Sequence, residues 1–193
     1  MRGRRVVLRD WTHGDVKAFV HWQRPDHTWR DFDGPYYRPP STEETARKAD
    51  VLRTRIDGQD WPTPRVVLPI TVDDELIGQV SRYWQSEETQ WLSLGVAIYD
   101  PDNWNRGLAY EALGLWCEYQ FEAAPALRRL DLRTWSGNLG MMRLAEKLGF
   151  TQEACFRQAR TVRGEIYDGL GYGILRSEWR DRHPHGFAIA DDT

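Results

Sequence analysis

The sequence predicts an α/β protein with a mixed, largely antiparallel sheet that is flanked by helices. Runs of β-branched and aromatic residues at 65–72, 75–86 and 91–100 are separated by short polar turns, which is typical of an antiparallel meander. Apolar residues at helical spacing come before and after this meander, so helices and strands are mixed in one unit. The 193 residues are enough for a single domain with a sizeable core.

Two helices and a loop are expected before the meander. Residues 4–11 read as a short strand, and residues 12–23 read as a helix with apolar residues on one face. Residues 24–40 are rich in proline, glycine and aspartate and carry several aromatic residues, which predicts a loop. Residues 41–56 predict a second helix, because Ser or Thr followed by glutamates forms a capping box.

The segment 102–113, "DNWNRGLAYEAL", predicts a helix whose start binds an anion. The first N–H groups of a helix lack intrahelical partners, and the helix dipole adds positive charge there. Gly107 leaves space for a ligand, Ala109 stays small, and Arg106 adds a charge. The segment is neither a P-loop nor a dinucleotide fingerprint. A plain strand-to-helix turn is the alternative interpretation.

The C-terminal third completes the sheet. Residues 128–135 predict a strand, residues 138–150 a helix and residues 154–179 a closing hairpin. We expect one domain over residues 1–180 and a tail over residues 181–193.

Composition and charge exclude several classes of protein. The formal net charge of −3 gives no general attraction to nucleic acid. No run approaches the roughly 18 apolar residues of a membrane helix, and the N-terminus has no apolar signal segment. We therefore expect a cytoplasmic protein that binds neither membrane nor nucleic acid. The two cysteines match no metal-binding spacing, so no metal site is predicted.

The motifs in their order along the chain resemble those of the GNAT N-acetyltransferases, and in particular the RimJ/RimL-like branch. That branch carries a tryptophan, a basic residue, glycine, any residue, glycine or alanine, and then Glu-Ala. The matching residues here are Trp104, Arg106, Gly107, Ala109, Glu111 and Ala112. The branch also carries an asparagine before a helix that ends in Glu-Lys-Leu-Gly-Phe, matched by Asn138 and residues 146–150. The resemblance extends to about residue 180.

The resemblance implies the acyl-CoA N-acyltransferase fold, with a fourth strand that splays from the fifth, and acetyl-CoA as cosubstrate. The pantetheine arm would then lie along Val96, Ala97 and Ile98, with Asn138 on its other side. The pyrophosphate would sit on the backbone amides of five consecutive residues: Arg106, Gly107, Leu108, Ala109 and Tyr110. The N–H of Ala97 or Ile98 would donate to the thioester oxygen as the oxyanion is formed.

The implied reaction is acetyl transfer to a primary amine by direct attack in a ternary complex. Ser93 and Asn138 are the catalytic candidates, and the general base is not identified. Ser93 stands where many members of the branch carry glutamate, while Met141 and Ala145 stand at positions where many members carry Ser or Ala and Tyr, respectively. Either water or a loop carboxylate serves as base, or the protein binds acyl-CoA without catalysis.

The acceptor is expected to be a protein or peptide N-terminus, with a small-molecule amine or an amino sugar as the alternative. Its candidate site is the aromatic loop, at Trp29, Asp31, Phe32 and Tyr36. Asp31 and Asp33 could attract or deprotonate an amine, or they could be solvated turn residues. By analogy, the closing hairpin could pair two copies in a homodimer.

Overall fold

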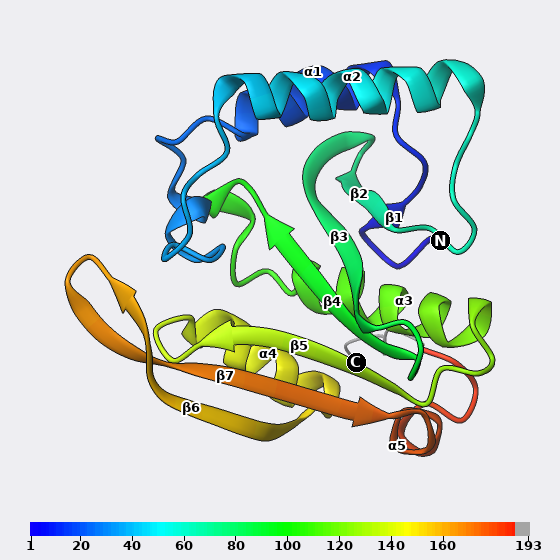
Figure 1. Ribbon diagram of the computed structural model, residues 1–193. Helices are drawn as coiled ribbons and strands as arrows, with labels where there is room; N and C mark the ends of the chain where they lie inside the picture. The colour runs from blue at the N-terminus through cyan, green and yellow to red at the C-terminus, as the bar shows by residue number, and fades with distance from the viewer. Residues whose placement is uncertain (188–193) are drawn as a thin grey trace.

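A seven-stranded sheet with the order β1-β2-β3-β4-β5-β7-β6 forms the centre of the protein (Figure 1). The computed structural model describes residues 1–187. The strands are β1 (Val7–Leu8), β2 (Val67–Val72), β3 (Glu75–Ser86), β4 (Trp91–Ile98), β5 (Arg129–Trp135), β6 (Thr151–Val162) and β7 (Glu165–Leu175). The helices are α1 (His13–Trp22), α2 (Thr42–Gly58), α3 (Leu108–Ala123), α4 (Leu139–Leu148) and α5 (Arg176–Arg182), with short 3-10 turns at η1 (Thr28–Asp31) and η2 (Pro101–Asn103).

Helices cover both faces of the sheet, and each face has its own core. α3 and α4 pack on one face through a large apolar cluster that includes Trp116 and Leu148. α1 and α2 pack over the β1–β3 side of the other face through a smaller cluster around Phe19 and Leu52 (Figure 1). The predicted α/β class, with its mixed and largely antiparallel sheet, is confirmed.

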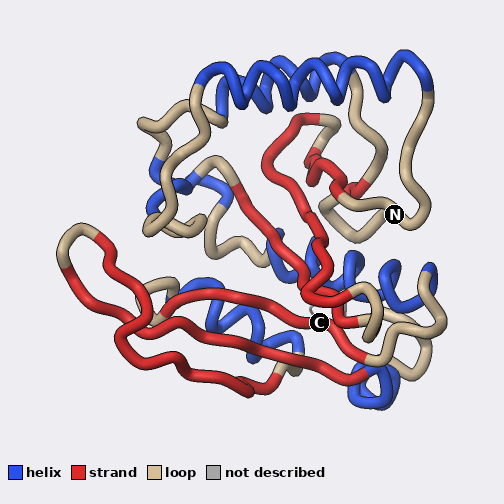
Figure 2. Tube along the Cα trace, in the orientation of Figure 1, coloured by secondary structure: helices blue, strands red, loops and turns tan. Residues whose placement is uncertain are grey.

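The sheet opens between β4 and β5, which are its one parallel pair among the described strands. The two strands pair only over the first half of β4, where Trp91 to Leu94 lie opposite Arg129 to Leu132. On its other side β4 stays paired with β3 as far as Ile98. Residues 95–98 therefore have a strand neighbour on one side only, and Figure 2 shows the two strands diverging. This is the splay that the family resemblance implies.

Two elements differ from the sequence prediction. The first strand has two residues rather than the eight of 4–11, because the N–H groups of Arg5 and Val6 donate to the Glu111 carboxylate rather than to a neighbouring strand. The last strand ends at Leu175 rather than 179, because the Glu178 carboxylate accepts from the Leu175 N–H at 2.8 Å and starts helix α5.

The segment predicted as a tail packs in part against the domain. Phe187 is buried, its ring stacks on Trp179 with a centroid distance of 5.8 Å, and its N–H donates to Glu118. Residues 188–193 of that segment lie outside the described part of the chain. Within the described part, no helix is long and apolar enough to cross a membrane.

Candidate active site

The start of α3 has backbone N–H groups that no side chain caps. Gly107 is the N-cap with φ of 77°, a left-handed conformation that favours glycine, and no side chain caps the helix. Asn105 is also left-handed, with φ of 57°. Within residues 1–187, the N–H groups of residues 106–110 donate to no protein group. Such a set of uncapped amides at a helix N-terminus has the geometry that binds anions.

A buried carboxylate fixes the chain next to this site. Glu111 lies in the first turn of α3 and is 1% exposed. One of its oxygens accepts the N–H groups of Arg5 at 2.7 Å and Val6 at 2.9 Å, and the Arg5 guanidinium lies 3.6 Å from the other. The N-terminal strand is thereby held against the helix start. Arg106 is exposed and donates to the Asn103 side chain at 3.1 Å.

The open edge of β4 has a defined orientation. The Tyr99 N–H donates to Ile77 on β3 at 2.8 Å. Because backbone groups alternate in direction along a strand, Ala97 also faces β3, whereas Val96 and Ile98 face the gap beside β5. The indole N–H of Trp104 donates to the Ile98 carbonyl oxygen at 2.9 Å, so that carbonyl already has a partner. The groups left open on this edge are the N–H and C=O of Val96 and the N–H of Ile98.

The two residues proposed as catalytic occupy different surroundings. Asn138 is the N-cap of α4: its side-chain oxygen accepts from the Met141 N–H at 3.0 Å, and its side-chain nitrogen donates to the Phe32 carbonyl at 3.2 Å. Ser93 is fully buried in the paired half of β4, where it accepts from the Gln85 side chain at 3.0 Å. Asn138 therefore connects α4 to the aromatic loop, and Ser93 lies away from the cavity described next.

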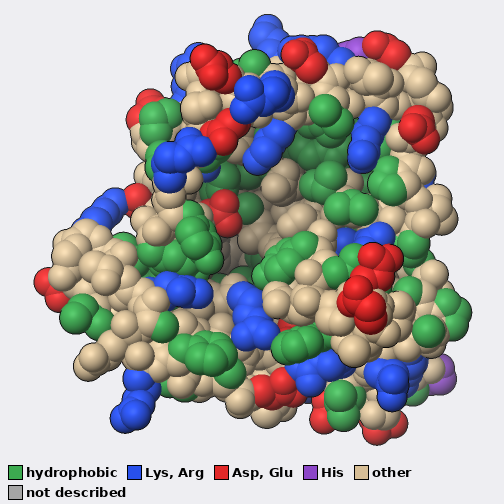
Figure 3. All heavy atoms as spheres, viewed as in Figure 1, with side chains coloured by type: hydrophobic (Ala, Val, Ile, Leu, Met, Phe, Trp, Pro, Cys, Tyr) green, Lys and Arg blue, Asp and Glu red, His purple; other side chains and the backbone are tan. Residues whose placement is uncertain are grey.

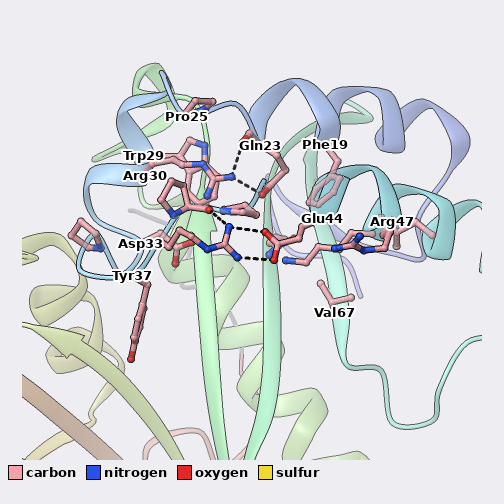
Figure 4. Close-up of a pocket in the computed structure, with 18 of the residues that line it drawn as sticks. Phe19, Gln23, Pro25, Trp29, Arg30, Asp33, Tyr37, Glu44, Arg47 and Val67 are labelled. Atoms are coloured by element: carbon pink, nitrogen blue, oxygen red, sulfur yellow. Dashed lines mark hydrogen bonds and ion pairs between the residues drawn. The ribbon is translucent and has the colours of Figure 1, made fainter. Parts of the chain in front are cut away.

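A cavity of about 800 Å³ opens under α2. It is bounded by α1, α2, the loop at 24–40 and strands β2 and β3, and Figure 4 shows side chains of these elements around it. Apolar wall residues include Trp11, Phe19 and Trp29. Gln79 of β3 also lines the cavity and lies opposite Ala97 in the β3–β4 register, so this wall of the cavity is one strand away from the open half of β4.

The four residues proposed for the acceptor site separate into two pairs. Trp29 and Asp31 line the cavity, as the sequence suggests. Phe32 does not; its ring meets Trp104 edge-on at 5.4 Å. Tyr36 does not line the cavity either, because its ring lies under the Arg160 guanidinium at 4.4 Å.

The two loop aspartates also differ. Asp31 forms an ion pair with Arg163 at the β6–β7 turn. Asp33 lines the cavity and has no hydrogen-bond partner within the described residues. Asp33 is an exposed side chain, but the protein groups around its carboxyl displace part of the surrounding water and raise its pKa, while the charges of Arg30 and Lys48 oppose that rise. Asp33 is thus the free carboxylate of the cavity.

A row of basic residues on α2 was not predicted from sequence. Arg47, Lys48 and Arg55 line the cavity from one face of the helix. Figure 3 shows a hollow on this side of the protein with basic side chains along its upper rim. Their helical spacing is visible in the sequence, but only the packing of α2 over the sheet assigns that face to the cavity.

An opened parallel strand pair beside an uncapped, glycine-initiated helix defines an acyl-CoA-dependent transferase fold. The chain belongs to the GNAT acetyltransferase family, since the family model described as "Acetyltransferase (GNAT) domain" matches residues 5–151. It is an acetyl-CoA-dependent acetyltransferase. The open β4 edge and the unblocked helix start fit that cosubstrate.

Known proteins agree with this assignment. The chain is 29% identical over 178 residues to the uncharacterized N-acetyltransferase YoaA of Bacillus subtilis, covering 89% of this chain and 94% of that protein. RimL, an alpha-N-protein acetyltransferase of ribosomal L7/L12 solved with coenzyme A, superposes with a TM-score of 0.68 at 19% identity, over 90% of this chain and 95% of RimL. The spermidine/spermine N-acetyltransferase SpeG of Vibrio cholerae superposes with a TM-score of 0.66 at 18% identity, over 92% of this chain and 98% of SpeG.

Proposed function

We propose that this protein transfers the acetyl group of acetyl-CoA to a primary amine that enters the cavity under α2. The observation that carries the proposal is the position of the β4 edge. It runs beside the gap next to β5, and its residue Ala97 is paired with Gln79 of β3, which lines the cavity. A cosubstrate and an acceptor that approach from these two sides would meet at the end of β4, which lowers the entropic cost of reaction.

The same edge suggests which backbone groups hold the cosubstrate. When bound, acetyl-CoA supplies an activated acetyl thioester. Val96 and Ile98 would bind the pantetheine arm, and the amides of residues 106–110 would bind the pyrophosphate, with Asn138 on the far side of the gap. Of the two oxyanion donors expected from the sequence, Ile98 is favoured, because its N–H faces the gap and that of Ala97 faces β3.

Asp33 is the proposed general base. An amine reaches the site mainly as ammonium, so a group in the cavity must accept its proton, directly or through one water. Asp33 is open to the cavity, and its raised pKa makes it a better proton acceptor than an ordinary aspartate. Asp31 is paired with Arg163, and Ser93 is buried outside the cavity.

A small-molecule amine is the acceptor that the cavity favours. Its volume of about 800 Å³ falls within the roughly 300–1,000 Å³ of small-ligand sites. A protein or peptide N-terminus, which the name of RimL describes for that protein, is the second candidate.

Replacement of the proposed base provides the test. Asp33→Asn should lower kcat by roughly 10²–10⁴-fold, the usual contribution of a general base, while the Kd for acetyl-CoA stays the same. Release of the CoA thiol with a panel of amines measures kcat, and calorimetry measures binding. Asp31→Asn is the matched control and should retain most of the activity. Binding of acetyl-CoA without turnover of any amine would instead support a non-catalytic acyl-CoA-binding protein.

A further inference from the structure

The cavity is basic although the whole chain is acidic. Its lining contains six Arg or Lys side chains and three Asp or Glu side chains, in a protein with a formal net charge of −3. The basic residues are Arg30, Arg38, Arg47, Lys48, Arg55 and Arg163, and the acidic residues are Asp31, Asp33 and Glu44. Positive charge is therefore concentrated where the acceptor would bind.

Half of these basic side chains already have partners. Arg38 pairs with Glu44 at 2.7 Å, and Arg163 pairs with Asp31. Arg30 donates to the side chain and carbonyl of Gln23 at 2.7 and 2.8 Å, as the dashed lines in Figure 4 show.

The other three basic side chains are those on α2. Arg47, Lys48 and Arg55 form no ion pair with any residue that the structure describes. They share one face of the helix with Leu52, which packs into the smaller core, so they follow one wall of the cavity. In Figure 4, Arg47 projects from α2 above Val67 of β2. This wall has cations available for a ligand.

An acid lies close to this wall. Asp33 comes from the loop, and the charge of Lys48 acts on it, as does that of Arg30. The cavity thus combines one free carboxylate, suited to an ammonium group, with a wall of unpaired cations suited to an anion. Charges of both signs in one cavity complement a ligand that is itself zwitterionic.

We propose that the acceptor is a small primary amine that also carries a carboxylate or phosphate group, with its amine at Asp33 and its anion on the Arg47–Lys48–Arg55 row. The inference rests on the proposed acetyl transfer and specifies its substrate class. Arginine binds either anion in a bidentate manner, so both forms are included. Polyamines, the substrates in the name of SpeG, carry only positive charge and are repelled by the same row.

Pairs of acceptors that differ only in the anion test this inference. Phenylalanine is compared with phenylalaninamide, and glucosamine 6-phosphate with glucosamine; the first pair tests a carboxylate and the second a phosphate. We expect kcat/KM to be about tenfold higher for the anionic member of at least one pair, the effect of one charge-assisted contact. Calorimetry on the CoA-loaded protein gives the same comparison without catalysis, and we expect tighter binding of the anionic member.

Charge-removing variants assign the preference to the row. Arg47→Gln with Arg55→Gln should raise KM for the anionic acceptor about tenfold and leave KM for acetyl-CoA unchanged. Arg53→Gln is the matched control, because Arg53 lies on α2 outside the cavity and pairs with Asp50. The inference would be overturned if both anionic acceptors bind no more tightly than their counterparts that lack the anion. It would also be overturned if the double variant still prefers the anionic acceptor. Failure to bind acetyl-CoA would instead refute the proposed function itself.

Discussion

Gly107 offers a decisive test of the cosubstrate site. We consider its replacement by leucine, which puts a side chain beside the open amides at the start of α3. The residue has φ of 77°, so any L-residue there is strained. A Cβ would lie 3.1 Å from a terminal nitrogen of Arg5, the mobile end of a half-exposed side chain that can move away.

The structure separates the stability cost of this change from its cost in binding. The left-handed backbone should account for most of the loss of stability, about 1–2 kcal/mol. The steric conflict adds little to this loss of stability, because the Arg5 side chain can move away. Loss of one amide contact to a phosphate removes about 1.5–3 kcal/mol, which corresponds to a rise in the acetyl-CoA Kd of roughly tenfold or more.

Gly164 provides the control for backbone strain. It lies at the β6–β7 turn with φ of 85°, and a Cβ there meets nothing within 4 Å. Urea unfolding should therefore give Gly107→Leu and Gly164→Leu similar losses of stability. Calorimetry with acetyl-CoA should show weakened binding for Gly107→Leu alone. If Gly107→Leu binds acetyl-CoA within about threefold of the unaltered protein, the helix start is not the phosphate site.

Two further predictions concern stability and assembly. Burial raises the pKa of Asp15, but hydrogen bonds from Arg9 and Thr12 outweigh this effect and lower the pKa overall. The stabilisation of the folded state by the Asp15 carboxylate is therefore present above the unfolded pKa of about 3.9, and it is lost as pH falls through the folded pKa. Asp15→Asn should therefore lower the unfolding free energy by about 2 kcal/mol at pH 7, and the difference from the unaltered protein should shrink in acid; a pH-independent difference in urea unfolding would contradict this. The β6–β7 hairpin exposes Phe156 (53%) and Ile166 (62%), and we expect it to pair two copies. Light scattering should then report a dimer that Phe156→Glu dissociates, and a monomer at all concentrations would contradict it.

The proposed cosubstrate site could be predicted from sequence because its signals are local. Gly107 and the small Ala109 lie within one turn of helix, and the amides they leave open belong to the same segment. The capping boxes of α1 and α2 are equally local and begin both helices close to the predicted positions. The β4–β5 splay is long-range, and its prediction depended on the family resemblance.

The proposed acceptor site depends on contacts between distant segments, which local patterns do not contain. Asp31 and Asp33 are two residues apart in one loop, yet only Asp31 meets Arg163, which is 132 positions further along the chain. That pairing leaves Asp33 as the free carboxylate. The basic face of α2 likewise reads as a solvated helix surface until the fold places α2 across the cavity from β2 and β3. The sequence alone determined the fold class and the glycine-initiated, uncapped start of α3, because backbone geometry and residue spacing encode both. Tertiary packing decided which carboxylate is free and which cations face the cavity, because charge pairing depends on distances in space.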